Sequence, residues 1–400
     1  MKIDRLDHNG RGITFIDNKI TFVSNALPGE DVDIKLITNK KKYCEAEVLK
    51  INNNSEYRQV PKCKYYDLCG GCDIMHINYK NQLEFKKNKL IDILKKFADI
   101  DCKVNFIESE KIYNYRDKIT LKVKGNKIGY YKKKSNEIIE IDNCLIVDII
   151  INEKINLLKK VKDFKSCYEI VIRNVNSNKT AITFYLHNKN DIIDFKDDDS
   201  IITYIYQNKV SYTNTNSNII AKLGSFEFIV SPQSFFQINL EQIQKILFNI
   251  KQYLKTKEGN LLDLYCGTGS IGIYLSDIFN EVYGIEICEP AIEDAKLNAK
   301  LNNVNNIFFY CGDTEKIIKK VNKKFDTLIV DPPRAGLTIS VIEDIFNINP
   351  TNLIYISCDP ITLSRDLKNI KEKYNIVDIT GYDMFPNTNH IETVCVLERK

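Results

Sequence analysis

The sequence predicts an α/β protein whose C-terminal part is a doubly wound, mainly parallel sheet. From about residue 238 onward, apolar runs of strand length alternate with segments of helical period. A glycine-rich turn joins the first of these strands to its helix, and the residues before 238 read mostly as short strands. We therefore expect two smaller β-rich units, a barrel and a central domain, ahead of the α/β domain.

Length and composition agree with such an organisation. The 400 residues suffice for two or three domains, and the 44% hydrophobic content supports packed cores. No apolar run approaches the roughly 20 residues that span a bilayer, and the N-terminus lacks a signal-peptide core. We therefore expect a cytoplasmic protein with no membrane contact and no obligate protein partner, hence a monomer. The net charge of +4 permits a nucleic-acid partner without requiring one.

Residues 1–55 are expected to form the small β-barrel. Apolar and polar residues alternate over 12–16, 19–23 and 31–36, and Asn9-Gly10 and Pro28-Gly29 supply the turns. Barrels of this type bind RNA through basic surfaces and exposed aromatic rings.

Residues 56–230 are expected to form the central domain. It begins with a dense cluster of cysteines, and residues 78–98 then follow a helical period. This helix could pack on the C-terminal domain. The expected strands are 118–123, 127–131, 168–173, 180–186 and 226–229.

Residues 231–400 are expected to form the α/β domain. The expected helices are 239–254, 269–279, 290–301, 338–347 and 360–370. The expected strands are 260–264, 282–286, 306–310, 326–330 and 351–357, with two more near the C-terminus.

The glycine loop predicts a nucleotide-containing cofactor. Gly267, Gly269 and Gly272 match G-x-G-x-x-G between a strand and a helix, and Glu286 ends the next strand, where a carboxylate holds ribose hydroxyls. This pattern suits a dinucleotide or S-adenosylmethionine. The alternative is a tight strand-to-helix turn that binds no ligand. The turn Asp331-Pro332-Pro333-Arg334 favours S-adenosylmethionine, because a proline pair makes a rigid ledge for a flat substrate.

Cys358 is the candidate nucleophile, although a buried inert cysteine is the ordinary alternative. It follows an apolar strand, and Asp359-Pro360 should cap the next helix, whose N-terminus is expected to lower the pKa of the thiol. A thiolate that adds to carbon 6 of uracil makes carbon 5 nucleophilic toward a methyl donor. A base must then remove the proton of carbon 5, and Glu392, before the last strand, is the candidate.

The cysteine cluster predicts a metal centre. Cys63, Cys69 and Cys72 are spaced by six and three residues, which suits zinc or an iron–sulfur cluster. A fourth ligand is needed; Cys144 is the natural candidate, but Cys44 and Cys102 compete on spacing.

Taken together, these motifs resemble those of the RNA 5-methyluridine methyltransferase family. The resemblance lies in 263–269, 331–334, 355–360 and 383–392, and it extends to 231–239. Residues 1–55 resemble a TRAM domain. The resemblance implies a Rossmann-like class I methyltransferase domain in which Cys358 is the nucleophile and Glu392 the base. It also implies an S-adenosylmethionine site lined by Gln237, Tyr265, Gly267, Gly269, Ser270, Glu286, Asp313 and Asp331.

The 23S rRNA branch of this family is the most similar. By this resemblance Cys63, Cys69, Cys72 and Cys144 hold a 4Fe–4S cluster, with zinc as the alternative. The tRNA branch generally lacks the barrel and the cysteines, so 23S rRNA is the expected substrate; archaeal members with similar cysteines modify tRNA, which keeps tRNA as the alternative. Arg116 is expected to hold a phosphate or to form an ordinary ion pair. Phe235, Phe236 or Phe385 is expected to stack on the flipped uridine, or to be core.

Three other functions fit the motifs less well. An amino-group methyltransferase would have no task for Cys358 and Glu392. A cytosine-5 RNA methyltransferase should carry a cysteine beside the proline ledge, where this chain has Arg334. A non-catalytic RNA-binding iron–sulfur protein would not need an intact glycine loop with Glu286.

Overall fold

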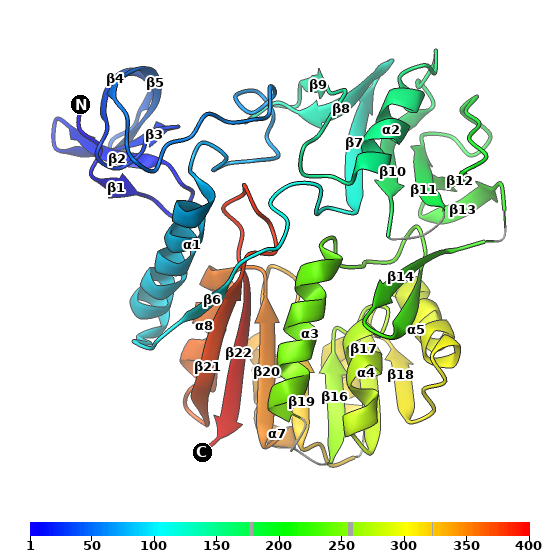
Figure 1. Ribbon diagram of the computed structural model, residues 1–400. Helices are drawn as coiled ribbons and strands as arrows, with labels where there is room; N and C mark the ends of the chain where they lie inside the picture. Colours follow the sequence, from blue (N-terminus) through cyan, green and yellow to red (C-terminus); the bar gives the residue numbers. More distant parts are fainter. Residues whose placement is uncertain (176–178, 216, 255–258, 322) are drawn as a thin grey trace.

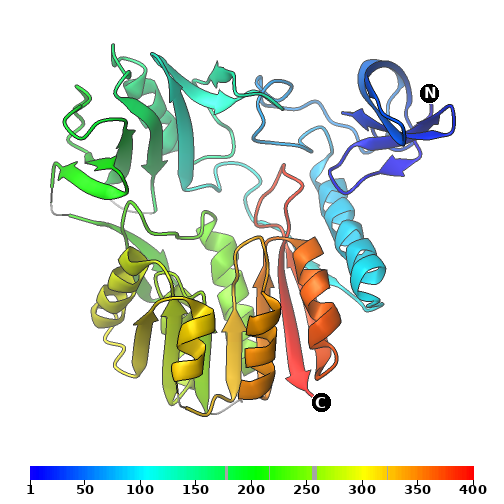
Figure 2. The same ribbon diagram turned by 180° about the vertical axis from the view of Figure 1, so that it is seen from behind.

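The strands form sheets of five, seven, two and eight strands in the part of the chain that the structure describes. This computed structural model describes residues 1–175, 179–215, 217–254, 259–321 and 323–400. Figures 1 and 2 show the five-, seven- and eight-stranded sheets as three separate bodies, with the first two above one end of the third.

The five-stranded sheet is the N-terminal barrel. Its order is β1-β2-β3-β5-β4, and its small core contains Ile3, Val23 and Val32. The strands are β1 (Arg5–Leu6), β2 (Gly12–Ile16), β3 (Lys19–Ser24), β4 (Asp31–Asn39) and β5 (Tyr43–Asn53). The three predicted strands are confirmed, and β5, which was not predicted, pairs with both β3 and β4.

The seven-stranded sheet forms the central unit, in the order β13-β12-β11-β10-β7-β8-β9. Its strands are β7 (Lys118–Lys124), β8 (Lys127–Tyr131), β9 (Ile138–Glu140), β10 (Cys167–Arg173), β11 (Thr180–Leu186), β12 (Ser200–Tyr206) and β13 (Lys209–Thr213). Helix α2 (Ile149–Leu158) buries Ile151, Ile155 and Leu158 in the same core as the sheet. Helix α2 was not predicted, because its isoleucine-rich start suits a strand equally well.

The eight-stranded sheet has the order β18-β17-β16-β19-β20-β22-β21-β6. Its strands are β6 (Asn105–Ile107), β16 (Asn260–Leu264), β17 (Glu281–Glu286), β18 (Ile307–Cys311), β19 (Thr327–Val330), β20 (Asn352–Ser357), β21 (Tyr374–Tyr382) and β22 (Glu392–Arg399). The strands from β18 to β20 are parallel, whereas β22 is antiparallel to both neighbours. The strand order reverses between β16 and β19, and such a reversal opens a crevice at the carboxyl ends of the strands.

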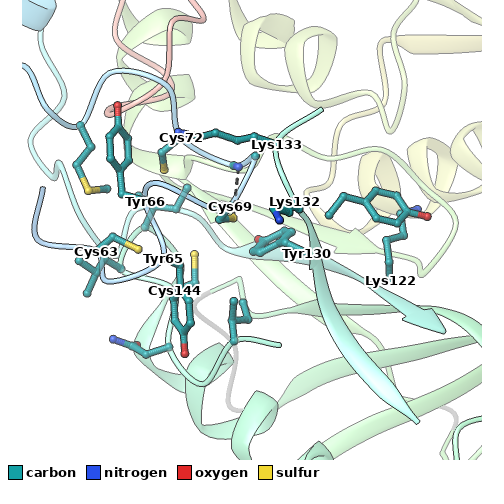
Figure 3. A pocket seen from close by; sticks show the side chains of 18 of the residues that line it. Cys63, Tyr65, Tyr66, Cys69, Cys72, Lys122, Tyr130, Lys132, Lys133 and Cys144 are labelled. Atoms are coloured by element: carbon teal, nitrogen blue, oxygen red, sulfur yellow. Dashed lines mark hydrogen bonds between the residues drawn. The ribbon is translucent and has the colours of Figure 1, made fainter. Parts of the chain in front are cut away.

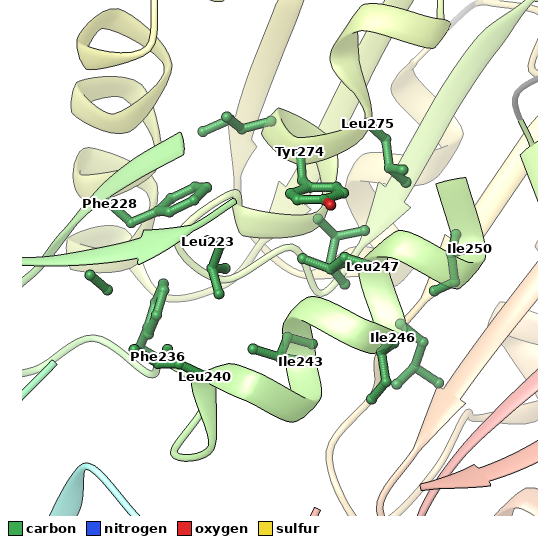
Figure 4. Packing of buried hydrophobic residues seen from close by; sticks show 14 of the residues in the cluster. Leu223, Phe228, Phe236, Leu240, Ile243, Ile246, Leu247, Ile250, Tyr274 and Leu275 are labelled. Carbon is green, nitrogen blue, oxygen red and sulfur yellow. The ribbon is translucent and has the colours of Figure 1, made fainter. Parts of the chain in front are cut away.

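Helices cover both faces of this sheet. They are α3 (Leu240–Leu254), α4 (Ser270–Leu275), α5 (Glu289–Leu301), α6 (Thr314–Ile317), α7 (Ile339–Ile348) and α8 (Pro360–Ile370). Figure 4 shows α3 packing Ile243, Leu247 and Ile250 toward α4 and toward the hairpin of β14 (Ile219–Leu223) and β15 (Phe226–Val230). Within the described residues, the search for a helix long and apolar enough to cross a membrane found none.

The predicted helix 78–98 is α1 (Tyr79–Ile93), continued by a π-helical turn, η1 (Leu94–Ala98). It buries Leu90 and Leu94 in the same core as α7 and α8 of the eight-stranded sheet. Its buried face also carries a lysine, Lys86, whereas the aromatic side chain of Phe97 on η1 is exposed. The buried lysine is tolerated because it forms an ion pair with the buried carboxylate of Asp383.

Candidate active site

Cys358 and Glu392 lie at adjoining strand ends. Strands β20 and β22 are antiparallel, with Ser357 opposite Thr393, so the next position of the ladder brings Cys358 beside Glu392. Asp331 directly follows β19, which is the parallel neighbour of β20 on its other side. Three chain segments thus place a thiol and two carboxyl groups at one edge of the sheet.

The surroundings keep the Cys358 thiol protonated. Burial, together with the charges of Glu392 and Asp331, raises its pKa to about 11, although the charge of Arg334 and a hydrogen bond from it act in the opposite direction. The expected lowering of this pKa is therefore wrong. Asp359 explains part of the difference: its Oδ1 accepts the N–H groups of Ile361 and Thr362, both at 2.9 Å, so these helix-terminal amides are already occupied.

The pKa values of the carboxyl groups near Cys358 are also raised. Glu392 is only 4% exposed, and burial together with the charge of Asp331 raises its pKa well above the ordinary value. Burial raises the pKa of Asp331 to about 7. Asp263 is buried beside them; its Oδ2 accepts the N–H of Gly272 at 3.2 Å, while its Oδ1 has no partner in the described structure. Such a group of carboxyls can accept and hold a proton near neutral pH.

The turn after Asp331 is fixed to helix α8. The Nη2 of Arg365 donates to the carbonyl of Leu337 at 3.0 Å, and the Oδ2 of Asp366 accepts the N–H of Leu337 at 2.8 Å. Thr362 Oγ1 donates to the carbonyl of Arg334 at 3.1 Å. Because α8 begins just after Cys358, one helix holds both the thiol and the proline ledge.

The glycine loop contacts Glu286 directly. The Glu286 carboxylate accepts the N–H of Gly267 at 3.1 Å and that of Cys288 at 2.9 Å. Gly267 and Gly269 have φ of 52° and 77°, which favours glycine at both positions. A Cβ on Gly269 would also lie 2.8 Å from the ring of Phe309, so the loop can only follow this path with glycine there.

Most of the other predicted cofactor residues gather at the same sheet edge. Tyr265 follows β16, and burial raises its pKa to about 12. Asp313 follows β18 and caps α6, with its Oδ1 accepting the N–H of Glu315 at 3.0 Å. Ser270 is the first residue of α4, and Gln237 is half-buried just before α3.

The three aromatic candidates differ in their surroundings. Phe236 belongs to the core, where its ring centroid lies 5.9 Å from that of Phe228. Phe235 is 63% exposed. Phe385 is half-buried, and its ring meets that of His390 edge-on at 6.1 Å. Phe235 and Phe385 thus stay available for stacking on a substrate base.

The four predicted metal ligands line one cavity of about 480 Å³, between the segment 63–72 and the seven-stranded sheet. Figure 3 shows the side chains of Cys63, Cys69, Cys72 and Cys144 around it. The two competing cysteines lie elsewhere: Cys44 is buried on β5 in the barrel, and Cys102 packs against the core of the eight-stranded sheet.

The four thiols influence one another across this cavity. Burial raises the pKa of Cys69, Cys72 and Cys144, and the charge of Cys63 raises each of them further. Basic side chains share the wall, among them those of Arg116, Lys132 and Lys133. As they stand, no three Cys, His, Asp or Glu side chains among the described residues are grouped closely enough to hold one metal ion. The thiols therefore surround a space instead of converging on a point.

Arg116 faces this cavity, and its Nε donates to the carbonyl of Lys118 at 2.8 Å.

Several residues of this region were not predicted. Gln82 and Lys86 lie on the buried face of α1 and contact the loop 383–391, which ends at Glu392. Their signal in the sequence is their spacing, since both fall on the face that also buries Leu90 and Ile93.

Comparisons with known proteins agree with this geometry. The model of the tRNA (Uracil-5-)-methyltransferase family matches residues 78–400, and that of the TRAM domain matches residues 1–49. An uncharacterized RNA methyltransferase of Staphylococcus aureus is 34% identical over 99% of this chain and 96% of its own. A second, from Clostridium acetobutylicum, is 36% identical over the same shares. The crystal structure of the Pyrococcus abyssi tRNA (uracil-54, C5)-methyltransferase with S-adenosyl-L-homocysteine is similar, with a TM-score of 0.81, 28% identity and 99% of both chains covered.

Proposed function

We propose, from the premise that this chain belongs to the tRNA (uracil-5-)-methyltransferase family, that it methylates carbon 5 of a uridine in cytoplasmic 23S rRNA. It is an S-adenosylmethionine-dependent RNA methyltransferase with a class I methyltransferase fold and a TRAM domain, as its sequence predicts. One observation carries the reaction: Cys358 and Glu392 stand side by side at the ends of β20 and β22.

The proposed reaction uses these two residues in turn. The Cys358 thiolate adds to carbon 6 of the uracil, and Arg334 favours that thiolate through its hydrogen bond. Carbon 5 of the resulting enolate would take the methyl group that a bound S-adenosylmethionine supplies, and the sulfonium sulfur would keep the electrons of the broken S–C bond and leave as S-adenosylhomocysteine. Glu392 then takes the proton of carbon 5, the C–H electrons restore the ring double bond, and the bond to Cys358 breaks to release the thiolate.

The cofactor is proposed to lie across the carboxyl ends of β16 to β19. Glu286 would hold its ribose hydroxyls and the backbone of Gly267 and Gly269 would pass close to it. The other proposed contacts are Gln237, Tyr265, Ser270, Asp313 and Asp331. The support is their position, because all but Gln237 follow a strand end or open a helix at this edge.

Two variants test the chemistry. Each is incubated with labelled S-adenosylmethionine and with transcripts of 23S rRNA and tRNA. We expect the parent to make 5-methyluridine on the rRNA and Cys358→Ala to make none. Glu392→Gln should accumulate a covalent protein–RNA adduct, because the base that allows elimination is missing. A Cys358→Ala variant as active as the parent would exclude this mechanism.

Transfer RNA is the second candidate substrate. The specific observation in its favour is the similarity to the Pyrococcus abyssi tRNA enzyme over 99% of both chains. The barrel and the cysteine set favour rRNA, because the family resemblance associates them with the 23S branch. In the assay above, label found only on tRNA would assign the activity to tRNA.

We also propose that Cys63, Cys69, Cys72 and Cys144 hold a 4Fe–4S cluster. Thiols spread around a cavity of about 480 Å³ suit a cluster better than one zinc ion, whose thiolate ligands must all lie about 2.3 Å from a single centre. Protein prepared without oxygen should be brown and contain iron and sulfide. Colourless protein that contains zinc would overturn this assignment.

A further inference from the structure

We propose that Asn387 is a positioning residue that connects the loop bearing the base to the cysteine segment. Through this connection, a shift of the cysteines around their cavity would change the position of Glu392. The base loop is residues 383–391, which link β21 to β22 and end at Glu392. The cysteine segment is residues 63–74. This inference rests on the proposed function, and it adds a link that the roles of Cys358 and Glu392 do not require.

The backbone of Asn387 is bonded directly to the cysteine segment. Its carbonyl accepts the N–H of Asp73 at 3.1 Å and that of Ile74 at 3.2 Å. These are the two residues that follow Cys72. In Figure 1 the base loop, in red, rises from the start of β22 toward this segment. A shift of Cys72 is therefore passed to the base loop through two hydrogen bonds.

The side chain of Asn387 is fixed just as tightly. Its Nδ2 donates to the carbonyl of Ile112 at 2.8 Å, and its Oδ1 accepts from Nε2 of Gln82 at 3.3 Å. In return, the N–H of Asn387 donates to Oε1 of Gln82 at 3.0 Å. Asn387 is 2% exposed and Gln82 is 1% exposed, so water cannot replace these bonds.

Other contacts make the base loop dependent on the same neighbours. Lys86 Nζ bonds Asp383 at 2.5 Å and the carbonyl of Phe385 at 3.0 Å, and the hydroxyl of Tyr115 donates to the carbonyl of Pro386 at 3.0 Å. Three other parts of the chain thus hold the loop in place: α1, the cysteine segment and residues 112–115.

A displaced base loop should impair one chemical step more than the other. Cys358 lies at the end of β20, whose place is set by the sheet, so thiolate addition does not depend on the loop. Proton removal does, because Glu392 must come within hydrogen-bond reach of the carbon-5 proton. Misplacement by about 1 Å can slow such a step by about 10²-fold. The covalent adduct should therefore accumulate.

Asn387→Gly is the test variant. Glycine accepts the φ of 68° at this position but removes both side-chain hydrogen bonds. We expect turnover to fall about 10- to 100-fold, with adduct formation nearly unchanged and adduct accumulating as in Glu392→Gln. The matched control is Asn389→Ala in the same loop, which loses only a hydrogen bond from Nδ2 to the carbonyl of Asn9. This variant should show the same ratio of covalent adduct to released product as the parent.

The link to the cysteine cavity is tested with Cys72→Ala. We expect the same accumulation of adduct, and faster amide hydrogen exchange over residues 383–391 in the protein without RNA. Should Asn387→Gly fail to fold, Asn387→Asp, which turns the Nδ2 donor into an acceptor facing the Ile112 carbonyl, replaces it in each comparison.

The outcomes separate the two proposals. Equal loss of adduct formation and turnover in Asn387→Gly would show a purely structural role and overturn the inference. A parent-like ratio of adduct to product in Cys72→Ala, together with unchanged hydrogen exchange over residues 383–391, would overturn the link to the cavity. Absence of any adduct in Glu392→Gln would instead contradict the proposed function itself.

Discussion

At the scale of single residues, the protonation of Cys358 depends on its burial and on three charged neighbours with opposite effects. Burial, Glu392 and Asp331 favour the thiol, and Arg334 favours the thiolate. A nucleophile that stays protonated without its substrate is protected from oxidation, since oxidation proceeds through the thiolate. The Arg334 side chain is exposed and belongs to the ledge on which the substrate is proposed to rest.

The titration of Cys358 should follow these charges. Its pKa is raised to about 11, so the thiolate fraction is small at neutral pH and grows as the pH rises toward 11. Alkylation of the Cys358 peptide by iodoacetamide, followed by mass spectrometry, should therefore increase about tenfold per pH unit between pH 8 and 10. In Glu392→Gln the curve should move to lower pH, and in Arg334→Met to higher pH. Curves that coincide for all three proteins would contradict this account.

At the scale of elements, helix α1 belongs with the catalytic sheet although it precedes the central unit in the chain. Its residues Leu90 and Leu94 share a core with α8, and β6 after it pairs with the edge strand β21. Residues 56–230 were expected to form one central domain, with the helix over 78–98 able to pack on the C-terminal domain. The local pattern predicts the helix itself, but its partner is decided by contacts with residues almost 300 positions away.

The buried ion pair between Lys86 and Asp383 should stabilise the attachment of α1. Both side chains are fully buried, and Lys86 Nζ lies 2.5 Å from Oδ1 of Asp383. Lys86→Met therefore leaves the Asp383 carboxyl group buried without its partner. We expect the free energy of unfolding, measured with denaturant, to fall by about 3–5 kcal/mol. Lys80→Met is the control on the same helix; because Lys80 is exposed, it should change stability by no more than about 0.5 kcal/mol. Equal effects of the two changes would show that the ion pair contributes nothing.

At the scale of the whole molecule, the barrel is held beside α1 by a small apolar cluster and an ion pair. Leu27 of the barrel packs with Ile74 and Ile77, and Arg58 Nη2 donates to the Glu30 carboxylate at 2.8 Å. The barrel, α1 and η1 together line a groove of about 660 Å³. Its charged residues include four basic ones, Arg5, Arg11, Lys95 and Lys96, and two acidic ones, Asp7 and Asp92. This groove is suited to the phosphates of an RNA strand.

RNA passing through this groove should make affinity depend on salt through Lys96. If Lys96 contacts one phosphate, Lys96→Gln should weaken binding and reduce the slope of log affinity against log salt by about 0.7 to 0.9. Lys40→Gln, in the turn between β4 and β5 and outside the groove, should leave the slope unchanged. Filter binding at several salt concentrations measures both slopes. An unchanged slope in Lys96→Gln would exclude a phosphate contact at this residue.

The sequence by itself determined the local features of this protein. The glycine loop, the capped start of α8 at Asp359-Pro360 and the alternation of strands and helices follow from interactions between residues close in the chain. The family resemblance drew on the same short motifs.

Only the tertiary structure decided what the distant residues do together. It placed Cys144, and neither Cys44 nor Cys102, around the cavity that Cys63, Cys69 and Cys72 line. It brought Glu392 beside Cys358 and bound Asn387 to Asp73. It also reversed the expected pKa shift of Cys358. The physical reason is that desolvation and the charge of neighbouring groups depend on which segments pack together, and no local pattern in the chain contains that information.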